Sequence, residues 1–184
     1  MNVFQRMMQE RLVLATFLLQ TLRPAQDLAP LVAHKFSGGA GMLAGISSVR
    51  AVCRVVVPMT PLIPFLVNKG FSGNDRLVAA SMSVAIAALA AAIPRCEVLQ
   101  SLHRVMALKG LCHIIRDSVM GAVLTRVAGA SNVGAFFGWQ HFMKAVSGAL
   151  SHMVTGYISG LDLALPYYIT AVCDLGYAVA YLYA

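Results

Sequence analysis

Six ionisable residues lie within two otherwise apolar stretches of this chain and recur at helical spacing. They are Arg50 and Arg54 in the earlier stretch, and Lys109, His113, Arg116 and Asp117 in the later one. Side chains four residues apart share one face of a helix. Such a face could handle an anion or a proton in a polar cavity, with Asp117 paired to Arg116, to Lys109 or to an arginine of the earlier stretch.

Two other interpretations of this polar face remain open. Some of its long side chains could reach out to lipid headgroups, or the face could bind cardiolipin or a partner subunit. Charges at bilayer depth are costly, so they are expected to face a bundle interior, a water-filled cavity or a protein neighbour. Because cations outnumber acids in the set, we favour the lipid or partner interpretation over a solute pathway.

Motifs for catalysis or metal binding do not occur in the sequence. It contains no HExxH, GxSxG, P-loop or GxGxxG pattern, and no His, Cys, Asp and Glu at metal-ligand spacing. The cysteines are scattered, which is typical of small apolar core residues; they are Cys53, Cys96, Cys112 and Cys173. We therefore expect no enzymatic activity, no cofactor and no metal. His141 and Lys144 beside Trp139 predict an interfacial anchor, and His152 a hydrogen-bonded packing residue.

The composition indicates an integral membrane protein. Of 184 residues, 59% are hydrophobic and 11% charged, and the mean hydropathy is +0.74, whereas soluble domains carry about 25% charged residues. The net charge is +7 without any Lys/Arg-rich run. Anionic lipid headgroups and the preference for basic residues on the inner side of a membrane explain this excess better than nucleic acid does.

The hydropathy pattern predicts an all-α fold, a polytopic transmembrane bundle of about six helices in a single domain over residues 1–184. The predicted helices span 3–33, 42–67, 77–94, 97–127, 135–159 and 163–184. The first contains Arg23 and Pro24, so a kink is expected there. The second carries three prolines at spacings of three, which predict a bent or partly non-helical later half.

Three glycine pairs at a spacing of four predict close helix packing. They are Gly41 and Gly45, Gly134 and Gly138, and Gly156 and Gly160.

The order of these features resembles one six-helix half of a major facilitator superfamily transporter. The first helix ends in DLAPLVAHKF. The loop NKGFSGNDR at 68–76 is similar to the family's signature between its second and third helices, Gly-x-x-x-Asp-Arg-x-Gly-Arg-Arg. Either Asn68-Lys69-Gly70 or Asp75-Arg76 stands in place of the Asp-Arg core. Arg126 and GASNVGAFFG precede a helix with Gly148 and Gly156. In the family, two such halves enclose the substrate, whereas 184 residues fit one half.

We therefore expect a non-catalytic, structural or accessory subunit of a larger membrane complex, with the bilayer, an anionic lipid such as cardiolipin and other membrane subunits as partners. The basic residues Arg6 and Arg11 before the first apolar run favour the mitochondrial inner membrane. The alternative is a small solute transporter that acts as a homodimer with a cationic, anion-handling cavity.

Overall fold

The described part of the chain consists of helices joined by turns and bends. A computed structural model describes residues 15, 18–20, 22–23, 29–36, 41, 44–45, 48, 51–52, 55–57, 60–65, 68, 73–128 and 133–183. The elements in order are α3 (Ala29–Phe36), α5 (Leu62–Phe65), α6 (Asp75–Ala92), the short 3-10 helix η2 (Ile93–Arg95), α7 (Leu99–Ala128), α8 (Val133–Leu161) and α9 (Leu165–Tyr183). No strand occurs among these residues, which confirms the all-α prediction.

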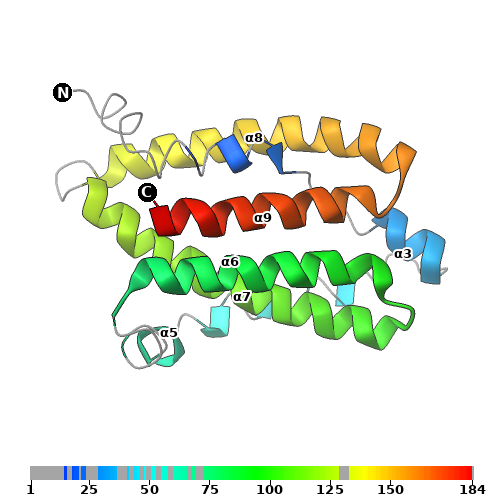
Figure 1. The fold of residues 1–184 in the computed structure, drawn as a ribbon, viewed down its shortest axis with the longest axis horizontal. Helices are drawn as coiled ribbons and strands as arrows, with labels where there is room; N and C mark the ends of the chain where they lie inside the picture. Colours follow the sequence, from blue (N-terminus) through cyan, green and yellow to red (C-terminus); the bar gives the residue numbers. More distant parts are fainter. Residues whose placement is uncertain are drawn as a thin grey trace.

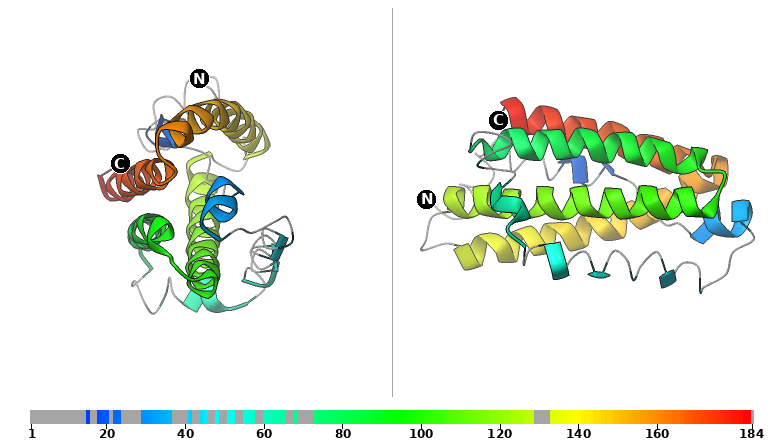
Figure 2. Two further views of the ribbon diagram at one scale, coloured as in Figure 1. Left: turned by 90° about the vertical axis from the view of Figure 1, so that its right-hand side faces the viewer. Right: turned by 90° about the horizontal axis from the view of Figure 1, so that it is seen from below.

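The four long helices alternate in direction along one common axis (Figure 1). α6 lies between α7 and α9 and packs most extensively against these two. α7 is the longest helix and crosses obliquely, so that its first half accompanies α6 and its later half reaches towards α8 (Figure 2). α8 packs against the rest of the described chain much less than α6 does. The bundle therefore has α6 at its centre and α8 at its margin.

Local sequence signals account for the ends of these helices. The Asn74 side chain accepts a hydrogen bond from the backbone N–H of Leu77 at 3.1 Å and caps the start of α6. The Asp162 side chain accepts one from Ala164 N–H at 2.7 Å in the turn before α9. Pro166 lies in the first turn of α9, where its missing N–H is harmless. α6 to α9 begin and end within two residues of the predicted ranges.

The first two predicted helices differ from the structure. Helical residues end at Leu22, Arg23 lies in a bend, and α3 is a separate helix that ends at Phe36 rather than at residue 33. A residue that precedes proline is disfavoured in helical conformation, and Pro24 follows Arg23. In the predicted helix over 42–67, Thr60 lies in a bend and α5 (Leu62–Phe65) is separate, at the proline-rich positions where non-helical backbone is expected.

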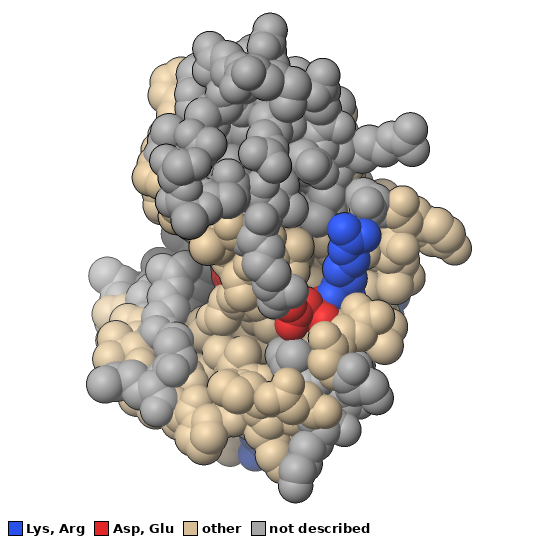
Figure 3. Space-filling view, turned by 90° about the vertical axis from the view of Figure 1, so that its left-hand side faces the viewer, with Lys and Arg blue, Asp and Glu red and all other residues tan. Residues whose placement is uncertain are grey.

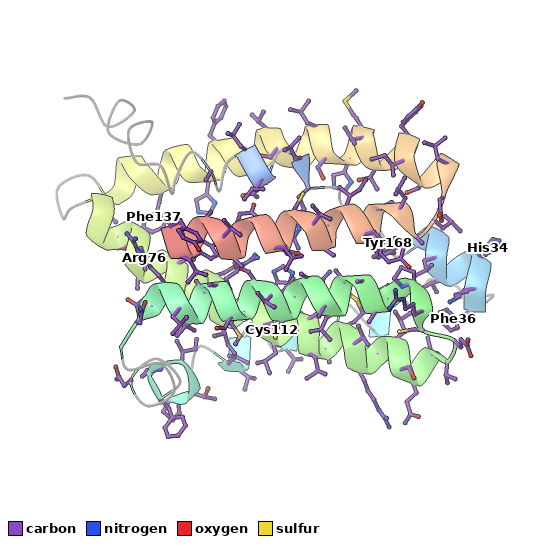
Figure 4. The ribbon with its side chains drawn as sticks, in the orientation of Figure 1. His34, Phe36, Arg76, Cys112, Phe137 and Tyr168 are labelled. Carbon is purple, nitrogen blue, oxygen red and sulfur yellow. The ribbon has the colours of Figure 1, made fainter. Side chains whose placement is uncertain are left out.

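The turn between α6 and α7 is held by α3. The Lys35 ammonium donates to the carbonyl oxygens of Pro94 at 2.6 Å and Cys96 at 3.0 Å. These carbonyls follow the last turn of α6, where helix carbonyls lack partners. A hydrophobic cluster lies beneath them; it comprises Leu31, Val32, Ile93, Cys96, Leu102 and Tyr167. In Figure 4, His34 of α3 and Arg76 of α6 lie at opposite ends of the bundle.

One helix of the described chain, Asp75–Arg95, is long and apolar enough to cross a bilayer by length and composition. The mean hydropathy of its most apolar window is 2.1. The remaining crossings stay predictions from the sequence.

Candidate functional site

Asp174 of α9 is the centre of a buried cluster of charged side chains. It is 0% exposed. Its Oδ2 accepts a hydrogen bond from Arg23 Nη2 at 3.1 Å, and its Oδ1 accepts one from Arg116 Nη1, also at 3.1 Å. A buried carboxylate requires such compensation, because an isolated charge away from water is very costly. Asp174 therefore joins three segments of the chain that are far apart in sequence.

Arg116 of α7 uses most of its guanidinium in this cluster. Besides Asp174, its Nε and Nη2 each donate to Asp117 Oδ1 at 3.2 Å. Its Cζ lies 5.3 Å from the centre of the Tyr177 ring, at a distance suited to a cation–π contact. The side chain is buried, so two carboxylates and an aromatic ring replace its hydration.

His113 lies between the two arginines. Its Nδ1 is 3.1 Å from Arg116 Nη2, and its Nε2 is 3.2 Å from Arg23 Nη2. Guanidinium groups only donate hydrogen bonds, and an imidazole with one ring proton has a single acceptor nitrogen. His113 can therefore accept from one of the two arginines at a time, and the other contact is a close approach of two N–H groups.

The local structure explains how these side chains meet. His113 and Arg116 are three residues apart on α7 and share a face. Asp174 and Tyr177 are likewise three apart on α9. Arg23 follows the helical residues 18–20 and 22, and its backbone N–H donates to Leu19 C=O at 3.0 Å. Arg23 lies in a bend at the end of this first described helical segment, so the segment places a cationic side chain at its end.

The predicted polar face is only partly brought together. Arg116 and His113 lie in the cluster, but the Asp117 side chain is 65% exposed and lies at the edge of the cluster. Lys109 is buried on α7, four residues before His113. Arg50 and Arg54 lie outside the described residues.

The acid at the centre of the cluster is therefore Asp174 rather than Asp117, and Asp174 and Arg23 were not among the predicted site residues. One signal in the sequence was available for Asp174, because it is the one acidic residue within the apolar run 163–184. Charged residues in such runs are expected to have a partner. The spacing within a single helix could not identify that partner, since Arg116 and Asp174 are 58 residues apart.

Most of the predicted packing glycines have no close neighbour among the described residues. A Cβ atom added at Gly41, or at the α8 glycines, would meet no heavy atom within 4 Å; the α8 positions are Gly134, Gly138, Gly156 and Gly160. At Gly45 the nearest atom is His103 Nε2 at 3.9 Å, an ordinary contact. Among the described residues, α8 turns a different face inward, and close packing at its glycines stays a prediction. Gly176 of α9, which was not predicted, is closely approached by Leu19.

The described residues that α8 buries are small and polar, and large apolar residues are exposed on both α8 and α9. The buried residues of α8 whose side chains are described are Ser147, Ser151 and Thr155, which lie at a spacing of four. Met153 and Tyr157 on its outer side are each 75% exposed. Side chains along the outer edge of α8 point away from the bundle and consist mostly of carbon (Figure 4). A soluble helix shows the opposite pattern.

The end of the molecule at which α6 begins has few charges among its described atoms. Figure 3 shows this end, where an acidic and a basic patch lie side by side among uncharged described residues. Of the described residues, no three His, Cys, Asp or Glu side chains are grouped as metal ligands would be.

A comparison of the chain with family models, with curated proteins and with solved structures finds no match. The function is therefore argued from the cluster and from the distribution of polar and apolar side chains.

Proposed function

We propose that this chain is a non-catalytic structural subunit of a larger membrane complex, built as a half-transporter-like bundle of about six membrane-spanning helices. The observation that carries the proposal is a buried ion pair in a bundle whose exterior exposes many large apolar side chains. Asp174 and Arg116 are buried and neutralise each other, while large apolar side chains such as Val172 and Tyr157 are exposed. A bilayer or neighbouring subunits would cover such an exterior without the cost of exposing it to water.

The saturated state of the cluster supports a structural rather than a catalytic role. Both oxygens of Asp174 accept from arginines, so its carboxylate has little capacity left to act as a base or to bind a cation. The two arginines are matched by Asp174 and Asp117, so the cluster has no excess positive charge to attract an anion. Its effect is to tie the first segment, α7 and α9 together.

The membrane in which the chain lies and its partners are part of the same proposal. We place the chain in the mitochondrial inner membrane, with cardiolipin and other membrane subunits as partners. The net charge of +7 and the basic residues Arg6 and Arg11 support this placement, because an anionic lipid attracts exposed basic residues near the membrane surface.

The test has two stages. The chain, carrying a C-terminal tag, is first extracted from membranes at alkaline pH, where an integral protein stays in the pellet. Mild detergent and a native gel then show whether it migrates in a larger complex, and mass spectrometry identifies the other subunits. Asp174→Asn is expected to lower the amount of that complex several-fold, and Asp117→Asn, at the exposed edge, is the matched control. A chain released at alkaline pH, or one that migrates alone, would contradict the proposal.

The second candidate is a solute transporter that acts as a homodimer. The convergence of Arg23, Arg116 and His113 in the interior, with Lys109 buried on the same helix as Arg116, favours it. An anion would then have to take the place of Asp174 between the arginines. Purified protein in lipid vesicles decides between the two functions. An Asp174→Asn variant that assembles at the wild-type level but loses uptake of an anionic solute would favour transport.

A further inference from the structure

His113 and Asp174 contact the same nitrogen atom of Arg23. Arg23 Nη2 lies 3.1 Å from Asp174 Oδ2 and 3.2 Å from His113 Nε2. The imidazole therefore lies beside the carboxylate oxygen to which Arg23 donates. A neutral His113 can accept a hydrogen bond from Arg23, whereas a protonated imidazole has a donor at each ring nitrogen and no acceptor. Protonation of His113 thus turns its contact with Arg23 into a contact between two donors that are both cations.

The ionisable groups in and around the cluster come from three parts of the described chain. They are Arg23 of the first segment, Lys109, Arg116 and Asp117 of α7, and Cys173, Asp174, Tyr177 and Tyr181 of α9. α6 has no ionisable side chain between Arg76 and Arg95, and the described histidines of α8 are exposed. Thiols and phenols ordinarily titrate above about pH 8. With His113 neutral, the two arginines are matched by two carboxylates, and a proton on His113 adds a further positive charge.

Arg23 is the cation that can leave this cluster. Its side chain is 19% exposed, and among the described residues it donates to one carboxylate, that of Asp174. Arg116 is 8% exposed and donates to both Asp174 and Asp117. When Arg23 leaves, Asp174 Oδ2 needs another donor, and the N–H of a protonated His113 is beside it. The exchange keeps two cations against two carboxylates, which a buried cluster requires because an unmatched charge there is costly.

We propose that His113 is an acid-sensitive latch for the first segment. Near neutral pH, Arg23 bonds Asp174 and ties the described residues 18–20 and 22–23 to α7 and α9. On acidification His113 takes up a proton, replaces Arg23 at Asp174 Oδ2 and releases these residues. Histidine is the side chain whose charge ordinarily changes between about pH 5 and pH 8, and His113 is partly exposed, so solvent protons reach it. The latch follows from the cluster itself and does not depend on the membrane complex proposed above.

Distances between spin labels test the latch in the purified full-length protein. In a background with the four native cysteines replaced by alanine, labelled cysteines replace Leu22 and Val179, which are 66% and 56% exposed. We expect the distance between these labels to lengthen by several ångström from about pH 8 to about pH 5. A control pair at Val84 and Val179 should keep its distance, because α6 and α9 pack directly against each other. An unchanged Leu22–Val179 distance would overturn the proposal, as would an equal change in the control pair.

Two variants assign the response to the two groups that compete for Asp174. His113→Gln keeps an acceptor for Arg23 but takes up no proton in this pH range, so the Leu22–Val179 distance should be the same at both pH values. Arg23→Gln removes the cation that the proton displaces, and it should abolish the change as well. A pH-dependent change that persists in either variant would overturn the latch. The proposed function is tested by alkaline extraction and native gel migration, so either proposal can fail without the other.

Discussion

Asp174→Asn should be among the most damaging single substitutions in the described chain. The change keeps the size of the side chain but removes its charge, and it replaces one acceptor oxygen with a donor N–H₂ group. That group would face the N–H groups of one arginine, whose nitrogen now lies 3.1 Å from the carboxylate oxygen. Arg23 and Arg116 would then share a buried site with only Asp117 to offset them.

The structure sets the expected magnitude. Removing one partner of a buried ion pair costs about 3–5 kcal/mol. Arg23 is 19% exposed and regains some hydration, and Arg116 keeps Asp117, so we expect about 3 kcal/mol. Asp117→Asn breaks an ion pair whose acid is 65% exposed, and it should cost less than about 1 kcal/mol.

The assay is equilibrium unfolding in mixed detergent micelles, followed by far-ultraviolet circular dichroism and by the fluorescence of the single tryptophan. Arg116→Gln alone and combined with Asp174→Asn complete a double-mutant cycle. We expect the double variant to lose clearly less than the sum of the two single losses, because the pair acts as a unit. Equal losses for Asp174→Asn and Asp117→Asn, or additive losses in the cycle, would refute the assignment of Asp174 as the centre.

Three further predictions concern other contacts. Lys35→Met should lower the unfolding free energy by about 1–2 kcal/mol, because two carbonyl oxygens at the α6–α7 turn lose a charged donor; faster amide hydrogen exchange at that turn would report the loss, and unchanged exchange would contradict it. Burial raises the pKa of the Cys96 thiol more than the nearby Lys35 ammonium lowers it, so this pKa lies above that of free cysteine. The pH midpoint of iodoacetamide alkylation should therefore be higher than for free cysteine, and higher still in Lys35→Met. Gly176→Leu should lower the unfolding free energy by about 1–3 kcal/mol through overpacking, since even a Cβ there would lie 2.8 Å from Leu19 Cδ2. Gly121→Ala has open space around it and should be neutral or slightly stabilising in the same unfolding experiment.

The all-α class and the last four helices follow from the sequence because their signals are local. Apolar runs bounded by charged residues, the cap at Asn74 and the proline at 166 act within a few residues of the position that they determine. The first two predicted helices were harder to define, since several prolines interrupt the apolar runs. Arg23 marks one such position, where the structure has a bend.

The composition of the cluster was decided by tertiary structure. The sequence placed Lys109, His113 and Asp117 on one side of a helix, but spacing along a helix does not determine what lies opposite that side. The packing of α7 and α9 on either side of α6, with Arg23 at the end of the first segment, made Asp174 the shared acceptor. For the same reason the glycines of α8 could be recognised from the sequence as a surface for close approach, but not which element lies opposite them; no described residue lies within 4 Å of a Cβ added there. Local interactions determine a helix and its faces, and contacts between residues distant in sequence determine which face is buried.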